Sequence, residues 1–268
     1  MHAADHPIWQ PSPARLSATH LTAFTRLAET LDNQRYPDYS SLWHASIARP
    51  ERFWSQLWDY AGVIGDKGSV ALEDKDGMRA ARFFPQSALN YAENLLRRRD
   101  DTLAMVFWGE DKVKRELTWW ELSDLVSRLQ QAMLAHGIAE GDRVAGYMPN
   151  MPETVAAMLA ASSIGAVWTS CSPDFGTDGA LDRFGQTAPR LLFCPDGYWY
   201  NGKQVDISEK MQIIASGLPS VEKVIVVPYL ERADAFAETV PKAVTLERFG
   251  PDPAALGRAC LRALAAAD

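Results

Sequence analysis

The feature that most constrains this chain is a regular alternation of β-type and helix-type segments that begins at Thr102. Short runs rich in β-branched and aromatic residues alternate with longer segments in which apolar residues recur at helical spacing. Such alternation is typical of βαβ units, in which a helix connects two parallel strands by a right-handed crossover. We therefore predict an α/β fold with a mostly parallel, doubly wound sheet and helices on its faces.

The predicted elements are separated by clear turn and capping signals. Thr118 and Glu121 have the spacing of a capping box, and Gly137 follows at the position where glycine commonly ends a helix. We predict strands at 103–108, 113–117, 144–148, 166–171, 190–194 and 224–227. We predict helices from the Thr118 cap toward His136 and at 152–163, 177–187, 207–216 and 253–267.

Residues 1–100 have a different pattern, which is helical and rich in tryptophan. Apolar residues recur at helical spacing in 19–31 and in a segment opened by Pro50, where Trp54 and Trp58 form an aromatic stripe. We interpret this stripe as packing surface, because convergent polar groups for a ligand are missing. We therefore divide the chain into three predicted regions: a helical N-terminal extension (1–100), an α/β subdomain (101–230) and an Ala-rich tail (231–268) that is the incomplete start of the next subdomain.

Charge and cysteine usage argue against several classes of protein. The chain has 27 Lys+Arg against 34 Asp+Glu, so a nucleic-acid partner is not expected, and the basic run 97–99 is interpreted as a solvated helix end. The uncharged stretch 154–173 contains several hydroxyl residues and lacks flanking cations, so it is interpreted as a buried helix and strand and not as a membrane span. Cys171, Cys194 and Cys260 are an odd set without C-x-x-C spacing, which favours a reducing, cytoplasmic location.

Ligand-binding residues are expected in the loops at the carboxyl ends of the parallel strands. Asp174 and Asp196 would form a carboxylate pair if their strands were neighbours, although Asp beside Pro or Gly is ordinary turn chemistry, which is the favoured interpretation. Cys171 and Cys194 are interpreted as small buried apolar residues and not as nucleophiles. The loops expected at the carboxyl ends of the strands are 148–153, 170–177 and 194–198.

Standard catalytic and nucleotide motifs are missing from the sequence. It contains no G-x-G-x-x-G, no G-x-x-x-x-G-K-[ST], no H-E-x-x-H and no G-x-S-x-G. The five histidines are scattered, so we predict no metal site. No residue of this chain is assigned a catalytic role.

The segment 198–203 combines aromatic rings, an Asn201-Gly202 turn signal and Lys203. A nucleotide that carries phosphates needs a π surface for its base and a cation for its anionic groups. The alternative is a surface hairpin whose lysine protects an exposed strand edge. Both interpretations stay open on these residues alone.

Several segments taken together resemble the adenylate-forming acyl-CoA synthetases, namely 117–122, 141–150, 152–153 and 160–168. A second set is similar to the acetoacetyl-CoA synthetase branch of that family, namely 89–96, 170–176, 182–186, 196–198 and 201–203. The resemblance runs from about Trp9 to Tyr229.

The resemblance implies a ligase that uses ATP, Mg²⁺ and CoA to convert acetoacetate into acetoacetyl-CoA, releasing AMP and pyrophosphate. It also implies that this chain is the N-terminal part of such an enzyme. The phosphate-binding loop that ends in lysine, the adenine- and ribose-binding motifs and the catalytic lysine of the family would all follow residue 268. We therefore expect these residues alone to be inactive.

The resemblance places part of the CoA contact on five residues of this chain. Ser172, Pro173 and Asp174 lie in the loop after the strand 166–171, and Tyr200 and Lys203 lie past the next strand. Tyr200 replaces a cation that the family pattern has there, whereas Lys203 keeps a positive charge. For such a site, the segments around Asp174 and Lys203 must meet at one edge of the sheet.

Two alternative functions stay open. One is a non-catalytic binding or interaction module that associates with itself or with a partner through an exposed apolar face. The other is part of a different short-chain acyl-CoA synthetase, acting on acetate or propionate.

Overall fold

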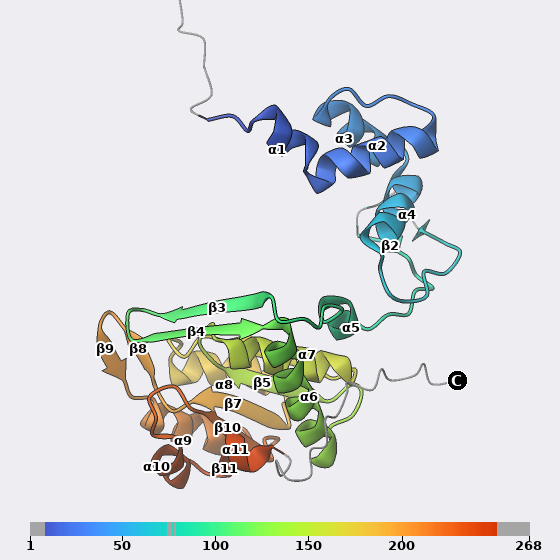
Figure 1. Cartoon of the computed structure of the whole chain (residues 1–268). Coiled ribbons are helices and arrows are strands. Elements are labelled where there is room, and N and C mark those ends of the chain that lie inside the picture. The colour runs from blue at the N-terminus through green and yellow to red at the C-terminus, as the bar shows by residue number, and fades with distance from the viewer. Residues whose placement is uncertain (1–8, 74–76, 78, 251–268) are drawn as a thin grey trace, which may run out of the picture. The chain divides into compact units, whose positions relative to one another are not determined.

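The computed structural model describes residues 9–73, 77 and 79–250, and the chain divides into two units, Met1–Leu89 and Asn90–Asp268 (Figure 1). The helix expected at 253–267 and Cys260 lie outside the described residues. Each unit has its own set of secondary-structure elements and is described by itself.

The first unit is built mainly from helices. Thr19 caps α2, and Asp38 forms a capping box with Ser41 at the start of α3. Asp32, at the end of α2, accepts a hydrogen bond of 2.7 Å from the side-chain amide of Gln56, which ties α2 to α4. The elements are α1 (Pro13–Ser17), α2 (His20–Asp32), α3 (Tyr39–Ala48), α4 (Pro50–Ala61), β1 (Leu72–Glu73) and β2 (Arg82–Phe83).

The second unit contains a five-stranded, fully parallel sheet in the order β11-β10-β7-β5-β6. Numbered along the chain, this is the 2-1-3-4-5 order of doubly wound proteins, with its switch point between β5 and β7. The α/β fold expected from the sequence is confirmed. The strands are β5 (Arg143–Tyr147), β6 (Val167–Cys171), β7 (Leu191–Pro195), β10 (Lys223–Val227) and β11 (Ala243–Thr245).

Helices cover both faces of this sheet. Successive residues of a strand point to opposite faces, so each strand contributes side chains to the core on either side. Leu191 and Phe193 of β7 join one buried core, and Leu192 and Cys194 join the other. The first core is covered by α5 (Tyr91–Leu95), α6 (Trp119–Ala135), α7 (Pro152–Ser163) and α11 (Leu246–Phe249). The second is covered by α8 (Thr177–Thr187), α9 (Ser208–Gly217) and α10 (Ala233–Thr239).

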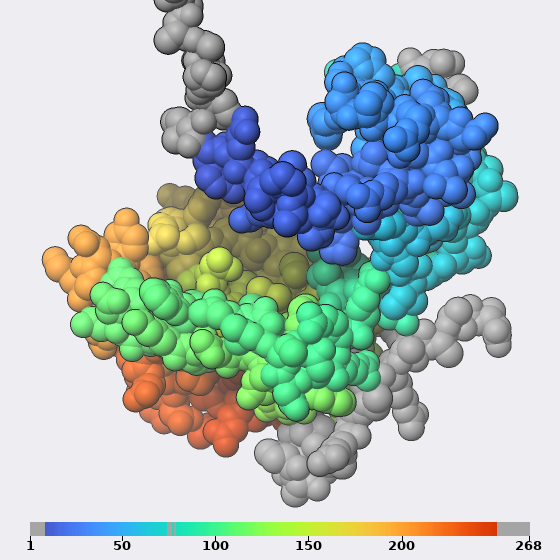
Figure 2. Space-filling model, turned by 45° about the horizontal axis from the view of Figure 1, so that its top comes forward, coloured from blue at the N-terminus to red at the C-terminus, as the bar shows by residue number. Residues whose placement is uncertain are grey.

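The strands β3 (Leu103–Gly109) and β4 (Val113–Thr118) form a separate antiparallel ribbon (green in Figure 2). Their inward-facing side chains, including Met105 and Phe107, pack against the first core. The capping box that follows β4 is confirmed, since the Glu121 N–H donates to the Thr118 hydroxyl at 3.2 Å and the Thr118 N–H donates to the Glu121 carboxylate at 2.7 Å. Both expected strands therefore exist, but as a ribbon outside the parallel sheet.

Two expectations about the sheet need correction. The strand predicted as buried within 154–173 is β6, which lies at the edge of the sheet formed by the described residues and pairs with β5, and its Val167 is 50% exposed. Residues 233–249, which the sequence pattern assigned to an Ala-rich tail, form α10, β11 and α11 and extend the same sheet. A strand of three residues is too short to show an alternating pattern, which is why the sequence did not indicate it.

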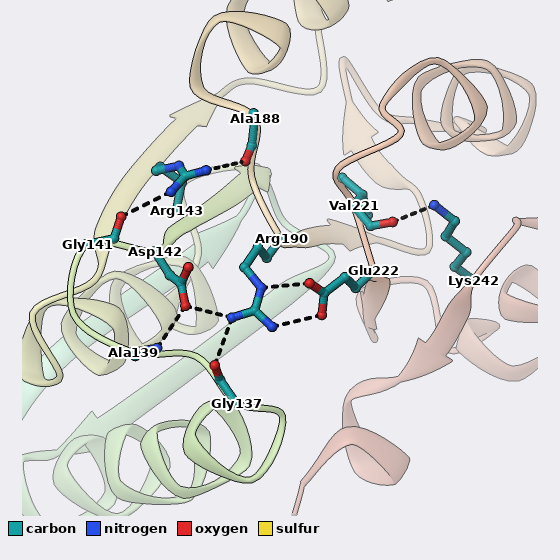
Figure 3. Close-up of polar contacts among 10 residues, drawn as sticks. All are labelled: Gly137, Ala139, Gly141, Asp142, Arg143, Ala188, Arg190, Val221, Glu222 and Lys242. Carbon is teal, nitrogen blue, oxygen red and sulfur yellow. Dashed lines mark hydrogen bonds and ion pairs between the residues drawn. The ribbon is translucent and has the colours of Figure 1, made fainter.

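The amino-terminal edge of the sheet is joined by a cluster of ionic contacts centred on Arg190 (Figure 3). Its guanidinium donates to Asp142 at 2.6 Å, to the Glu222 carboxylate at 2.7 and 3.1 Å, and to the carbonyl of Gly137 at 2.8 Å. One side chain thus links the segments that precede β5, β7 and β10. This edge is opposite to the carboxyl ends of the strands, where ligands are expected.

Within the described residues, no helix combines the length and the apolar character that crossing a bilayer requires.

Candidate ligand-binding site

The candidate site lies at the carboxyl edge of the parallel sheet. Tyr147 at the end of β5 is in register with Cys171 at the end of β6, and Pro195 at the end of β7 is in register with Val227 of β10. The loops that follow these strands therefore leave the sheet at one edge. The segments 170–177 and 194–198 therefore lie at the same edge of the sheet, as expected from the sequence.

The loop after β6 and the hairpin after β7 are joined by a hydrogen bond between Tyr198 and Asp174. The Tyr198 hydroxyl donates to one carboxylate oxygen of Asp174 at 2.8 Å, and the Ser172 hydroxyl donates to the other at 2.7 Å. These bonds from Ser172 and Tyr198 hold the pKa of Asp174 below its usual range. Asp174 is therefore an ionised, fully engaged acceptor and not a free general acid or base.

Two further side chains hold the backbone of the same loop. Tyr147 is completely buried, and its hydroxyl lies 2.7 Å from the Pro173 carbonyl and 2.5 Å from the Phe175 carbonyl, so it donates into the loop. Lys210 on α9 donates to the Pro173 carbonyl at 3.3 Å. Burial raises the pKa of the Tyr147 phenol, so the hydroxyl keeps its proton. The loop is thus supported by β5 and α9 as well as by Tyr198.

Two cationic side chains lie beside this loop. The guanidinium of Arg183 on α8 lies 4.6 Å from the ring centroid of Phe175, and Lys210 reaches the loop from α9. In the part of the chain that the structure describes, no carboxylate forms an ion pair with Arg183, Lys203 or Lys210. Lys210 also helps to lower the pKa of Asp174, so cationic side chains and an ionised carboxylate lie together at this edge.

Helix α8 begins directly after the loop. Its N-cap is Gly176, which has no side chain to accept a hydrogen bond, and a Cβ placed there would meet nothing within 4 Å. The first turn of α8 therefore has no side-chain cap, and it carries the acidic residue Asp178.

The hairpin predicted around Asn201-Gly202 is present as β8 (Tyr198–Tyr200) and β9 (Lys203–Val205). Asn201 and Gly202 both have positive φ, 51° and 73°, as a type I′ turn requires. Tyr200 and Lys203 are paired beside this turn, and Tyr200 is 63% exposed. The structure thus joins the base of the hairpin to the 172–174 loop through Tyr198, while Tyr200 and Lys203 lie at its exposed end.

The end of this hairpin meets the turn between β3 and β4, as Figures 1 and 2 show. The Gly202 N–H donates to the Glu110 carboxylate at 2.8 Å, and the Lys112 ammonium lies 5.5 Å from the ring centroid of Trp199. Neither Glu110 nor Lys112 stands out as functional from the sequence. The sequence indicates a turn between the two predicted strands. It does not indicate the contact of this turn with Gly202, because Gly202 lies 92 residues after Glu110.

Asp196 has a structural role and is not paired with Asp174. It is completely buried, and its carboxylate accepts the backbone N–H groups of Tyr229 and Leu230 at 2.8 Å and of Arg232 at 2.7 Å. This carboxylate fixes the turn that follows β10. A structural role for Asp196 is confirmed, but the turn that its carboxylate holds is the one after β10 and not its own.

The cysteines described by the structure, Cys171 and Cys194, are both buried. Burial raises the pKa of Cys171 to about 11 and that of Cys194 further, so neither is activated as a thiolate nucleophile. Their interpretation as small buried apolar residues is confirmed. Among the described residues, no group of three or more His, Cys, Asp or Glu side chains is placed to hold a metal ion.

The strand order and the helices on both faces define this unit as a doubly wound α/β domain. The model of the family described as AMP-binding enzyme matches residues 92–256, and the chain belongs to this family.

The similar proteins narrow this relationship. The chain is 47% identical to the acetoacetyl-coenzyme A synthetase of Rhizobium meliloti over 92% of its own length and 38% of that protein. It is 37% identical to the acetoacetyl-CoA synthetase of Gallus gallus over 90% of its own length and 37% of that protein. A solved structure, the acetoacetyl-CoA synthetase from Streptomyces lividans, superposes with a TM-score of 0.82 at 33% identity, over 92% of this chain and 39% of that one. The chain thus spans less than two fifths of the length of these relatives.

Proposed function

We propose that the chain forms part of an acetoacetate–CoA ligase and that its carboxyl edge binds the nucleotide end of CoA. In the overall reaction, acetoacetate, ATP and CoA become acetoacetyl-CoA, AMP and pyrophosphate. The similarity to acetoacetyl-CoA synthetases supports the choice of acetoacetate over acetate or propionate. The buried, unpaired Cys171 and Cys194 support a reducing, cytoplasmic location.

The observation that carries the CoA site is the Tyr198–Asp174 hydrogen bond. It joins the loop of Ser172, Pro173 and Asp174 to the hairpin that carries Tyr200 and Lys203, with Lys210 beside the loop. CoA has phosphate groups and an adenine base at this end, so it requires cations and an aromatic surface. CoA would supply the thiol that receives the acyl group, and this chain would bind and orient its opposite end.

Adenylation is assigned to residues outside this chain. The described residues offer no cluster of carboxylates for Mg²⁺, and the sequence contains no Gly-rich phosphate-binding loop of the standard form. We therefore propose that these 268 residues alone do not convert acetoacetate, ATP, Mg²⁺ and CoA into products. Measurable AMP release by the isolated chain would contradict this.

Calorimetric titration of the 268-residue chain with CoA and with 3′-dephospho-CoA tests the site. We expect CoA to bind, and Lys203→Ala to weaken binding by about 5- to 10-fold, because a charge-assisted phosphate contact is lost. Lys114→Ala is the matched control, since Lys114 lies over Trp108 on the β3–β4 ribbon. Equal affinities of the two variants and the unchanged chain would contradict the assignment of Lys203.

Self-association is a second proposal, supported by the outer face of the β3–β4 ribbon. Val106 and Trp108 on β3 are 54% and 67% exposed, and neighbouring Leu103 and Trp120 are 51% exposed each. Exposed apolar side chains gathered in this way favour association with a second copy. Sedimentation velocity of the chain and of Trp108→Ser tests it: a monomer at all concentrations in both would contradict the proposal.

A further inference from the structure

The end of the β8–β9 hairpin rests on the turn between β3 and β4 through two contacts of different chemistry. Glu110 accepts the N–H of Gly202 at 2.8 Å, and Lys112 lies over the ring of Trp199. Gly202 is the residue next to Lys203, and Trp199 is the residue next to Tyr200. Both contacts therefore act directly beside the two outer residues of the proposed CoA site.

The hairpin needs such a support because it is small. Its strands have three residues each, and an isolated two-stranded hairpin of this size is marginally stable in water. Tyr198 anchors only the base of the hairpin, through Asp174. If its end moved freely, ligand binding would have to order Tyr200 and Lys203 at a cost in conformational entropy.

The β3–β4 ribbon is a rigid support for this hairpin. Arg115 on β4 forms two hydrogen bonds, of 2.6 and 2.8 Å, with the carboxylate of Glu153 at the start of α7. Gly109, just before the turn, is buried against Tyr229, where an added Cβ would lie 2.3 Å from the phenolic oxygen. The turn that carries Glu110 is therefore held in place from both strands.

We propose that Glu110 and Lys112 are positioning residues of the CoA site, which hold the hairpin so that Tyr200 and Lys203 are ordered before the ligand binds. This inference rests on the proposed function, since it assigns a role in CoA binding to residues outside the loops at the carboxyl edge. Glu110 acts as a hydrogen-bond acceptor for Gly202, and Lys112 acts through the face of Trp199.

The charge of Glu110 provides a way to test this role. A carboxylate close to Lys203 would repel an anionic ligand if its only effect were electrostatic, and its neutralisation would then tighten CoA binding. A positioning residue behaves differently. Its removal weakens binding, and a neutral variant that keeps the acceptor oxygen restores most of the affinity.

The experiment measures CoA affinity by calorimetry for Glu110→Ala, Glu110→Gln, Lys112→Met and the control Lys114→Met. We expect Glu110→Ala to weaken binding about 5-fold and Lys112→Met about 2- to 3-fold, with Glu110→Gln within about 2-fold of the unchanged chain. Lys114→Met removes the same charge from the same ribbon, where Lys114 faces Trp108, and should leave affinity unchanged.

Hydrogen exchange of the Gly202 amide, followed by NMR without ligand, reports the contact independently of CoA. We expect faster exchange in Glu110→Ala than in Glu110→Gln. If the unchanged chain binds CoA and Glu110→Ala binds it equally well, or if Glu110→Gln binds more tightly, the inference is overturned while the proposed function stands. If the unchanged chain does not bind CoA although Gly202 is protected, the proposed CoA site fails, and the positioning role fails with it.

Discussion

The hydroxyl of Tyr198 donates a hydrogen bond of 2.8 Å to the carboxylate of Asp174, although the two residues follow different strands of the sheet. This bond joins the hairpin after β7 to the loop after β6. Both oxygens of Asp174 accept hydrogen bonds from neutral hydroxyl groups, which keep this carboxylate ionised and hold it in place.

Replacing Tyr198 with Phe should separate the loop from the hairpin. Asp174 would lose one of its two hydroxyl donors, so we expect its pKa to rise and the unfolding free energy to fall by about 1 kcal/mol. CoA affinity should fall together with stability. Urea unfolding and calorimetry measure the two effects. Tyr200→Phe is the matched control for stability, because Tyr200 is exposed, and equal stability of the two variants would contradict the role of Tyr198.

Replacing Arg190 with Met should destabilise the amino-terminal edge of the sheet. The variant leaves Asp142 and Glu222 without their shared cation, and we expect a loss of about 1–3 kcal/mol in urea unfolding near pH 7. The control is Arg128→Met, which removes an exposed ion pair with Asp124 and should change stability by less than about 0.5 kcal/mol. Similar losses in both variants would refute a special role of the Arg190 cluster.

The same cluster predicts how stability depends on pH. The pKa of Asp142 is lowered by the Ala139 N–H and by Arg190, and that of Glu222 is lowered by Arg190. Because these pKa values are lower in the folded chain, the stabilisation is complete above the ordinary carboxylate range of about 4 and is lost as the pH falls through the lowered values. We expect the unfolding free energy of Arg190→Met to fall less than that of the unchanged chain between about pH 6 and pH 3. Parallel curves would contradict this.

Two glycine-to-alanine substitutions should have opposite effects. A Cβ at Gly146 on β5 would lie 2.6 Å from the ring of Trp168, so Gly146→Ala should displace the indole and cost about 1–3 kcal/mol. A Cβ at Gly185 inside α8 meets nothing within 4 Å, so Gly185→Ala should stabilise the chain by up to about 1 kcal/mol. Urea midpoints and tryptophan fluorescence measure both. Destabilisation by Gly185→Ala would contradict the packing described for α8.

Thiol labelling tests the burial of the cysteines. In a Cys260→Ser background, Cys171 has a pKa of about 11, so we expect about 0.1% thiolate at about pH 8 and slow reaction with a disulfide reagent in the folded chain. Cys194 should be at least as slow, because it is completely buried. Both should react rapidly in guanidinium chloride. Rapid labelling of the folded chain would show that the second core is open to solvent.

Much of the local structure could be predicted from the sequence. The capping box of Thr118 and Glu121 and the turn at Asn201-Gly202 were both visible, because each depends on residues close together in the chain. The sequence indicates a structural role for Asp196 but not its partners, because the carboxylate accepts N–H groups that lie 33 to 36 residues further along the chain. The strand β11 was missed, since its three residues are held mainly by pairing with β10, which no local pattern records.

The sequence by itself determined that this chain folds into alternating strands and helices, because apolar spacing decides which face of each element is buried. Only the tertiary structure decided the strand order, and with it the meeting of Asp174 with Tyr198 and of Glu110 with Gly202. These pairs are 24 and 92 residues apart. The physical reason is that periodicity shows that a strand has neighbours, whereas packing of the whole sheet selects which neighbours they are.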